Sequence, residues 1–225
     1  MTYNVEDVNP DRDASLDAIE RADVDVVLLQ EITAGWQRAL VARFAARYPH
    51  RVIRLHRRSA GGLAVLSKLP LRSEELLAPV LSGWFPAQRV VIEAPFGPVQ
   101  ILHLHLRPPY DGGWIKGFLT TPPLRRQEIE VYWQALAELP TIVAGDFNED
   151  PTGLAVQFLE GNGLARAVTT GPTTWHYVEP ESKHELLKMD IDHVMIDSHF
   201  TASDAKVLDA GTSDHRPVVV TLRRK

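Results

Sequence analysis

The stretch TIVAGDFN at residues 141–148 decides the fold, because an apolar run leads directly into an acid and an amide. A second stretch, SDHRPVVVTL at residues 213–222, has the reverse order, with acid and imidazole groups ahead of the apolar run. Continuous β-branched runs are typical of buried strands, so each stretch places polar groups at the end of a strand. Carboxylates, an amide and an imidazole in one site favour metal-assisted attack of water on phosphorus.

Strands and helices alternate along the chain, without an internal repeat, low-complexity tract or linker. The strands outnumber the helices and come in hairpin-like groups rather than in strict βαβ order. This pattern predicts an α+β fold, a β-sandwich with helices on its outer faces. We expect strands at residues 3–5, 24–30, 51–55, 63–67, 89–94, 99–106, 141–144, 191–196 and 218–222, and helices at 11–22, 33–48, 122–139 and from about 152 to 161 or 163.

Composition limits the class of protein. The 225 residues, 44% of them hydrophobic, fit a single domain over residues 1–225 with a sizeable core. The absence of cysteine excludes disulfides and thiolate metal sites, and no apolar run approaches the ~20 residues that span a bilayer. The chain starts directly on a predicted strand without a signal peptide, so we expect a cytoplasmic monomer, although the abrupt start also fits a trimmed upstream segment.

The formal net charge of -5 argues against electrostatic binding of nucleic acid by the whole surface, although not against binding by a local basic patch. The stretch HRVIRLHRR at residues 50–58 is strongly basic. Two interpretations of it remain open: the solvent face of an edge strand with its turn, or a patch that faces phosphate.

Two polar residues near the N-terminus also stand at strand ends. Glu31 directly follows a buried strand, and Mg²⁺ in proteins uses one or two carboxylates together with water and substrate phosphate. The alternative for Glu31 is a cap on the next helix. Asn4 follows the stub of the first strand and is a weaker candidate by itself, because Asn often closes turns.

Asp146 and Asn148 are two residues apart, which on an extended chain places both side chains on one face. A carboxylate beside an amide can take a proton from water while the amide orients that water. Gly145, which precedes them, lets the backbone of another segment come close. A simple Asp-Phe-Asn turn is the alternative interpretation.

Asp192 lies inside an apolar strand, and a buried carboxylate is costly unless it is paired. A histidine is the natural partner, because the carboxylate fixes its tautomer and raises its basicity. We favour His215 at a strand entry over the neighbouring His193, which points to the opposite face. Asp214 then becomes a metal ligand or holds water beside His215.

His103 and His105 share one face of a strand because they are two residues apart. Two imidazoles can indicate zinc, but the sequence has no third His or Cys ligand at a familiar spacing. The alternative is that one ring donates a proton or binds phosphate while the other packs. The sequence also lacks the Gly-x-Ser-x-Gly and Gly-x-x-x-x-Gly-Lys motifs of serine hydrolases and nucleotide-binding loops.

Taken together, these motifs resemble those of the endonuclease/exonuclease/phosphatase superfamily. This group of metal-dependent hydrolases includes pancreatic-type deoxyribonuclease, abasic-site endonucleases, neutral sphingomyelinases and inositol polyphosphate 5-phosphatases. The resemblance implies a four-layer α/β sandwich of two mixed β-sheets packed face to face, with the site at one edge of both sheets. The matching motifs occur in order along nearly the whole chain: TYNV at 2–5, LQE at 29–31, GLAVLS at 62–67, HL at 105–106, GDFN at 145–148, IDH at 191–193 and SDHRP at 213–217.

The resemblance also implies roles for individual residues. Glu31, with Asn4 and Asp214, is similar to the family's Mg²⁺ or Mn²⁺ site. Asp146, oriented by Asn148, resembles the group that activates or positions the attacking water. His215, which Asp192 holds, resembles the imidazole that stabilises charge on the phosphoryl oxygens. His105 is similar to a histidine that binds phosphate or protonates the leaving oxygen. Asn4 and Asn148 are implied to contact substrate.

The chain departs from the family pattern after the strand that carries His105. Leu104 replaces the expected Thr, and His103 stands where many members have Asn, so we expect it to contact substrate. The following segment, RPPYDGGWIKGF at residues 107–118, is predicted to be a loop beside the site. Its aromatic residues are expected to stack on bases, to enter a lipid interface or to pack the loop down. Arg107, Arg125 and Arg126 are predicted to meet phosphate, and an ion pair with Glu130 is the equal alternative for Arg126.

The sequence therefore predicts a phosphodiester hydrolase that uses Mg²⁺ or Mn²⁺, with DNA or RNA as the favoured substrate. The alternatives are a phosphomonoesterase and a phospholipid phosphodiesterase of the sphingomyelinase kind that touches a membrane peripherally. An inactive binding module on the same scaffold is a further alternative, opposed by the filled catalytic positions.

Overall fold

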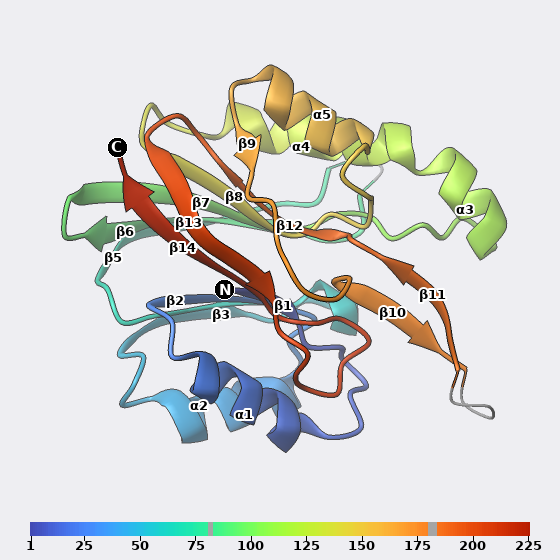
Figure 1. The fold of residues 1–225 in the computed structure, drawn as a ribbon, viewed down its shortest axis with the longest axis horizontal. Coiled ribbons are helices and arrows are strands. Elements are labelled where there is room, and N and C mark those ends of the chain that lie inside the picture. Colours follow the sequence, from blue (N-terminus) through green and yellow to red (C-terminus); the bar gives the residue numbers. More distant parts are fainter. Residues whose placement is uncertain (81–82, 180–183) are drawn as a thin grey trace.

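The computed structural model describes residues 1–80, 83–179 and 184–225 and contains two six-stranded sheets packed face to face (Figure 1). In the first sheet β1 (Thr2–Asn4) runs parallel to β2 (Val26–Gln30), and the other neighbouring strands of this sheet pair antiparallel. Helices α1 (Arg12–Ala22) and α2 (Ala34–Phe44) cover its outer face. Its strands, in spatial order, are β13 (Phe200–Val207), β14 (Val218–Arg224), β1 (Thr2–Asn4), β2 (Val26–Gln30), β4 (Leu63–Ser67) and β3 (His50–Arg54).

The second sheet is also mixed, because β7 (Gly97–His105) and β8 (Thr141–Asp146) are parallel and its other strand pairs are antiparallel. Helices α4 (Pro122–Gln134) and α5 (Leu154–Gly161) cover its outer face, and α3 (Trp114–Thr120) precedes α4. A 3-10 turn at Ser59–Gly61 precedes β4, and β10 (Trp175–Val178) pairs with β11 (Glu185–Met189) as a separate hairpin. The strands in spatial order are β5 (Leu71–Leu77), β6 (Ala87–Ala94), β7 (Gly97–His105), β8 (Thr141–Asp146), β12 (Asp192–Ile196) and β9 (Ala165–Arg166).

The four-layer α/β sandwich is thus confirmed, and strand periodicity explains it. In β2, Val27 and Leu29 pack under the helices, whereas Leu28 between them faces the other sheet. In β8, Val143 faces the helices and Ala144 faces the sandwich interior. Because both faces of the central strands are buried, their sequences are nearly continuous apolar runs.

The predicted elements are present with shifted ends, and five strands were missed. Helix α4 ends at Gln134 rather than at residue 139. The side chain of Gln100 donates to the carbonyl oxygen of Ala137 and accepts from its backbone N–H, which holds this segment against β7. The missed strands include β5 and β13, whose exposed, charged residues lack an apolar period. The others are β9, β10 and β11.

The loop prediction for residues 107–118 is wrong in part, because α3 forms within it. Gly117 allows this helix to lie against Pro109, whose carbonyl oxygen would be 2.1 Å from a side chain carbon at position 117. No helix in the described part of the chain is long and apolar enough to cross a bilayer.

The basic stretch at residues 50–58 belongs to the edge strand β3 and the turn after it. Arg54 makes a bidentate ion pair with Glu74 of β5, with its Nη2 2.6 Å from Oε2. Arg51 donates to the carbonyl oxygens of Ala45 and Tyr48 behind α2. These two arginines fit the edge-strand interpretation, whereas Arg58 lies over a tryptophan near the site, as described below.

Gly145 is the point where β7 and β8 approach too closely for a side chain. Its φ of 149° disfavours any L-residue, and an added Cβ would lie 1.9 Å from the carbonyl oxygen of Leu104. The residue that follows is Asp146, so this close approach sets where that carboxylate lies.

Gly145→Ala is therefore expected to lower the free energy of unfolding by about 2–3 kcal/mol through backbone strain and overpacking. Urea denaturation followed by circular dichroism measures the change. Gly161→Ala is the matched control, because nothing lies within 4 Å of a Cβ there. An unchanged unfolding midpoint for Gly145→Ala would contradict the described approach of the two strands.

Candidate active site

The predicted site residues converge because they occupy equivalent positions on neighbouring strands. In β8, Ala144 faces the sandwich interior, so Asp146 two residues later faces it too. His105 on β7 and Asp192 on β12 are both in register with Asp146, one on either side. Asn4 at the end of β1 closes the group from the opposite sheet.

Asp146 is the centre of this arrangement and is almost fully buried. Its Oδ2 accepts a hydrogen bond from Asn4 Nδ2 at 3.0 Å and lies 3.4 Å from His105 Nε2 and 3.6 Å from His215 Nε2. Its Oδ1 accepts from the backbone N–H of Asn148 at 2.8 Å. Burial raises the pKa of Asp146, and the two imidazoles and Asn4 oppose that rise. The carboxylate is thus stabilised by partners from both sheets.

His215 and Asp192 form a buried pair. The Nδ1 of His215 lies 2.8 Å from Asp192 Oδ2, which fixes the ring so that Nε2 points toward Asp146. Burial lowers the pKa of His215, but the Asp192 and Asp146 carboxylates outweigh burial and raise it well above its ordinary value. A ring with this pKa is suited to hold positive charge beside a phosphate. The alternative partner, His193, points to the other face and binds the carbonyl oxygen of Glu149.

His105 is held on two sides. Its Nδ1 lies 3.1 Å from the carbonyl oxygen of Ala60, and its ring stacks on Phe85 with centroids 4.4 Å apart. Because a carbonyl oxygen only accepts, Nδ1 carries the hydrogen and Nε2 faces Asp146.

A second group of acids lies next to Asp146 around Glu31. Glu31 has a φ of 64° and accepts from Asn4 Nδ2 at Oε1 and from the backbone N–H of Asp7 at Oε2. Glu6 was not identified from the sequence, although it lies two residues after Asn4. Burial, with the charges of Asp214 and Glu31 nearby, raises the pKa of Glu6 to about 7.

This crowding of carboxylates fits a hard divalent cation, because oxygen ligands and uncompensated negative charge are what Mg²⁺ or Mn²⁺ requires. A tighter group of possible ligands also exists, since one atom each of Asp146, Asp192 and His215 lie within 4.8 Å of one another. In that group Asp192 and His215 are already hydrogen-bonded to each other. The group around Glu31 is therefore the better candidate for a cation site.

Asp214, the other predicted ligand, is anchored by the hairpin. Its Oδ2 accepts from Trp175 Nε1 at 2.8 Å, and its carbonyl oxygen accepts from the backbone N–H of His176. Trp175 was not predicted from the sequence. Its contact attaches β10 and β11 to the strand entry that carries His215.

The structure does not bring two of the predicted substrate-binding residues to the surface of the site. His103 is fully buried between the sheets with Nε2 2.7 Å from Gln30 Nε2, and burial, with His105 nearby, lowers its pKa to about 3. Arg125 is buried too, and its Nε donates to Glu149 Oε2 at 3.1 Å. Because Glu149 also accepts from backbone N–H groups at the start of α5, Arg125 anchors the loop that follows Asn148.

Arg107 lies at the rim of the site. The guanidinium carbons of Arg107 and Arg58 lie 5.0 Å and 4.9 Å from the ring centroid of Trp84. Trp84 packs edge-on against Tyr110, and Phe85 next to it stacks on His105. We call Arg58, Trp84, Arg107 and Tyr110 the rim cluster. Arg126 pairs with Glu130 at 2.6 Å, as its spacing indicates.

A two-sheet α/β sandwich with carboxylates, an amide and imidazoles gathered at one end of both sheets defines a phosphoric ester hydrolase fold. The sequence pattern of the Endonuclease/Exonuclease/phosphatase family matches residues 1–215. The chain belongs to this family, which confirms the resemblance found in its motifs.

Solved structures share this fold over nearly the whole chain. An endonuclease/exonuclease/phosphatase from Beutenbergia cavernae is 22% identical with a TM-score of 0.74, covering 99% of this chain and 70% of that one. Sphingomyelinase C from Streptomyces griseocarneus is 20% identical with a TM-score of 0.68, covering 97% of both chains. A humanized D. rerio TDP2 is 16% identical with a TM-score of 0.72, covering 99% and 97%. No curated protein matches the sequence.

If the acids around Glu31 hold a divalent cation, Mg²⁺ or Mn²⁺ raises the melting temperature by mass action. At a roughly hundredfold excess over Kd we expect a rise of about 5–10 °C by differential scanning fluorimetry, reversed by EDTA. Glu31→Gln is expected to remove most of this rise, because it removes a charged ligand.

Glu138→Gln is the matched control, because this exposed carboxylate precedes β8 at the end of the sandwich away from the site. A rise of equal size in both variants would contradict the assignment of the cation to Glu31.

Proposed function

We propose that this chain hydrolyses phosphodiester bonds with the help of Mg²⁺ or Mn²⁺, and that its substrate is nucleic acid. The observation that carries the proposal is the environment of Asp146. This carboxylate lies 3.0–3.6 Å from Asn4, His105 and His215, each from a different strand or strand entry. Structural clusters rarely place two imidazoles and an amide around one acid, because apolar packing costs less.

Each residue has a role that follows from its contacts. Asp146 orients the attacking water and takes its proton, while the backbone N–H of Asn148 holds Oδ1 of that carboxylate in place. His215 donates from Nε2 to a phosphoryl oxygen, and Asp192 stabilises the positive charge of its ring. His105, when its ring is an imidazolium with hydrogens on both nitrogens, gives its Nε2 proton to the leaving oxygen. Glu31 and Asp214, with Asn4, would hold Mg²⁺ or Mn²⁺, which would neutralise charge on the phosphoryl oxygens.

The rim cluster supports nucleic acid as the substrate. Arg58 and Arg107 lie over the Trp84 ring and bring two positive charges for phosphate, and the ring together with the guanidinium planes provides flat surfaces on which a base can stack. The adjacent Phe85 contacts His105, so the cluster is continuous with the catalytic residues. A strand bound on the rim cluster would thus have a phosphate near Asp146.

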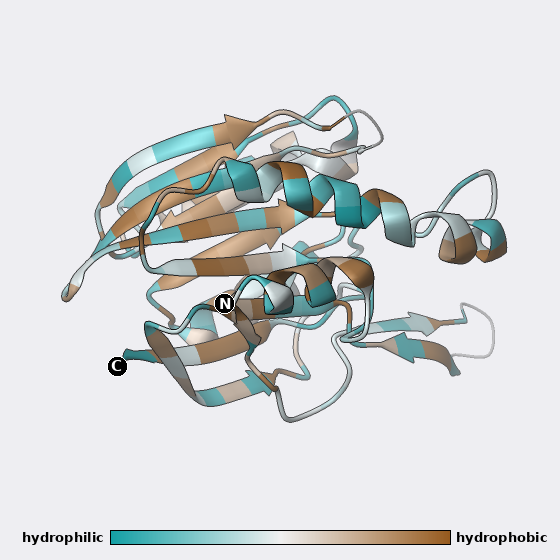
Figure 2. Cartoon of the chain, turned by 90° about the horizontal axis from the view of Figure 1, so that it is seen from above, coloured by the Kyte–Doolittle hydropathy of each residue, from teal (hydrophilic) through white to brown (hydrophobic). Residues whose placement is uncertain are grey.

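Phospholipid is the second candidate substrate, and the exposed apolar residues beside the site favour it. Helix α3 and the β10–β11 hairpin extend from the same end of the molecule, and both carry apolar side chains (Figure 2). On α3, Ile115 is 83% exposed and Leu119 is 79% exposed. On the hairpin, Leu186 and Leu187 are each more than half exposed. A phosphomonoesterase and an inactive binding module remain alternatives without a specific observation in their favour.

The main test is nicking of supercoiled plasmid with Mg²⁺, Mn²⁺ or EDTA. We expect metal-dependent nicking that Asp146→Ala lowers by at least about a hundredfold, because the variant loses the general base. Circular dichroism checks that the variant folds, and Glu160→Gln at an exposed position of α5 is the control. Nicking that survives Asp146→Ala would disprove the role of this carboxylate.

A pair of variants separates the two candidate substrates. Trp84→Ala is expected to raise KM for oligonucleotides by about 5–100-fold, since stacking contributes about 1–3 kcal/mol per base. It should leave KM for bis(4-nitrophenyl) phosphate unchanged. Leu119→Ser should alter neither.

The opposite pattern would assign a lipid substrate. In that case, release of headgroups from sphingomyelin or phosphatidylcholine vesicles would fall in Leu119→Ser and not in Trp84→Ala, and plasmid would remain intact. The rim cluster would then have no part in substrate recognition.

A further inference from the structure

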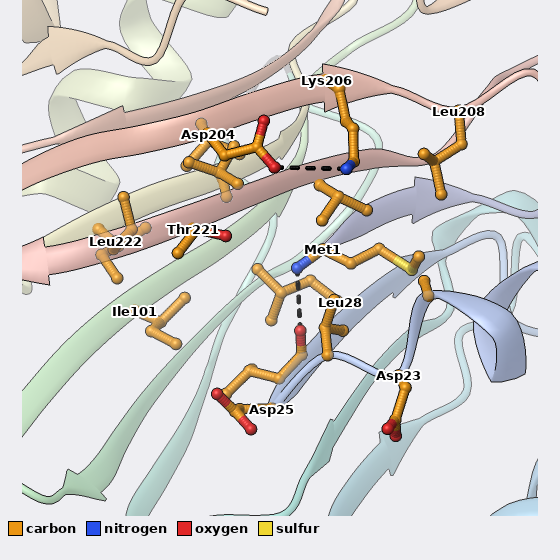
Figure 3. A pocket seen from close by; sticks show the side chains of 18 of the residues that line it. Met1, Asp23, Asp25, Leu28, Ile101, Asp204, Lys206, Leu208, Thr221 and Leu222 are labelled. Carbon is orange, nitrogen blue, oxygen red and sulfur yellow. Dashed lines mark hydrogen bonds and ion pairs between the residues drawn. The ribbon is translucent and has the colours of Figure 1, made fainter.

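The interior positions of two central strands change from apolar to polar one step before the active site. On β2, Leu28 faces the sandwich interior, so Gln30 two residues later faces it too. On β7 the same period places Ile101 and then His103 between the sheets. Leu28 and Ile101 line one pocket between the sheets (Figure 3). Gln30 and His103, which follow them, are fully buried and form a polar layer directly behind the active-site residues.

These two side chains form a hydrogen bond from one sheet to the other. The Nε2 of Gln30 lies 2.7 Å from Nε2 of His103 and 3.0 Å from Oγ1 of Thr2. Because an amide nitrogen only donates, His103 accepts at Nε2 and carries its hydrogen on Nδ1. The ring is neutral, since burial, with His105 nearby, lowers its pKa to about 3. The contact is therefore directional rather than ionic.

This hydrogen bond does not make the core more stable than two apolar side chains would. In the described part of the chain, Oε1 of Gln30 and Nδ1 of His103 are buried without a hydrogen-bond partner. An unsatisfied buried polar atom costs free energy, whereas replacing both partners of a hydrogen bond by apolar groups of similar shape is nearly neutral. The pair thus needs an explanation other than stability.

Both residues lie next to groups that are assigned to the reaction. Gln30 directly precedes Glu31, whose φ of 64° turns the chain out of β2, so Gln30 is the last residue of this strand between the sheets. Gln30 is also in register with Asn4, which donates to Glu31 Oε1 at 3.0 Å. On β7, His103 precedes His105 on the same face. The hydrogen bond thus connects the strand that leads to the candidate cation site with the strand that carries His105.

We propose that Gln30 and His103 are positioning residues whose hydrogen bond fixes the distance across the sandwich between Glu31 and His105. Both are fully buried, so neither touches substrate. Without this contact the apolar residues still pack the two sheets together, but Glu31 would hold a cation at the wrong distance from a phosphate beside His105. The inference rests on the proposed function, because it uses the roles assigned there to Glu31 and His105.

The test first separates positioning from stability. Gln30→Met leaves His103 without its partner and should lower the melting temperature by about 3–10 °C. The double variant Gln30→Met/His103→Leu makes both positions apolar and should melt within about 3 °C of the unmodified chain.

In the double variant we nevertheless expect weaker cation binding and slower turnover. The Kd for Mn²⁺, measured from the electron paramagnetic resonance of the free ion, should rise at least about fivefold. At saturating Mn²⁺, kcat for bis(4-nitrophenyl) phosphate should fall at least about tenfold, with KM unchanged because the residues that contact substrate are not altered.

Two further variants serve as rescue and control. His103→Gln keeps an acceptor near the position of Nε2 and should hold Kd and kcat within about threefold of the unmodified chain. Gln100→Met also removes a fully buried amide from β7, but that amide binds Thr141 and Ala137 at the end away from the site. It should lower the melting temperature without altering Kd or kcat.

Unchanged Kd and kcat in the double variant would overturn the proposal. Equal losses in Gln100→Met would also overturn it, since they would follow from stability alone. The Kd separates this inference from the proposed function: if the chain cleaves no phosphodiester but its Mn²⁺ binding weakens in the double variant, the positioning of Glu31 holds and the reaction does not. An unmodified chain that binds no Mn²⁺ would overturn both.

Discussion

The hydrogen bond from Asn4 to Asp146 joins the two sheets at the point where the chemistry is concentrated. A carboxylate buried between sheets costs several kcal/mol unless charged or polar partners compensate it. Here the partners come from three separate segments: β1, β7 and the entry to β14. The two sheets can pack around Asp146 only if these segments come together. The packing of the sheets and the formation of the active site therefore depend on the same contacts.

The residues behind Asp146 hold its loop in place. Gly145 sets the closeness of β7 and β8, and the Asn148 side chain donates to the carbonyl oxygen of Leu106. Arg125 and Glu149 then bind this loop to α4 and to the start of α5. The buried ion pair stabilises little by itself, since desolvation offsets most of its attraction. Its effect is to restrict the loop to one geometry, which an active site of this kind needs.

The two ends of the sandwich differ although the same strands form both. At one end the interior positions are Asn, His and Asp, and at the other they are Val, Ile and Leu. The polar end is surrounded by α3, the hairpin and the rim cluster, which determine what reaches Asp146. These surrounding elements lie outside the two sheets. The proposed reaction therefore depends on the residues at the polar end of the sheets, and the proposed substrate depends on the elements around them.

Local patterns in the sequence determined the fold class, the buried strands and the convergence of Asp146, Asp192 and His215, because period-two alternation fixes which face each side chain occupies. The sequence did not reveal that His103 and Arg125 are buried, that Glu6 joins the acids near Glu31, or that two arginines lie over the ring of Trp84. It also concealed α3. Each of these depends on what faces a residue from a distant segment, and only the packing of the two sheets brings those segments together.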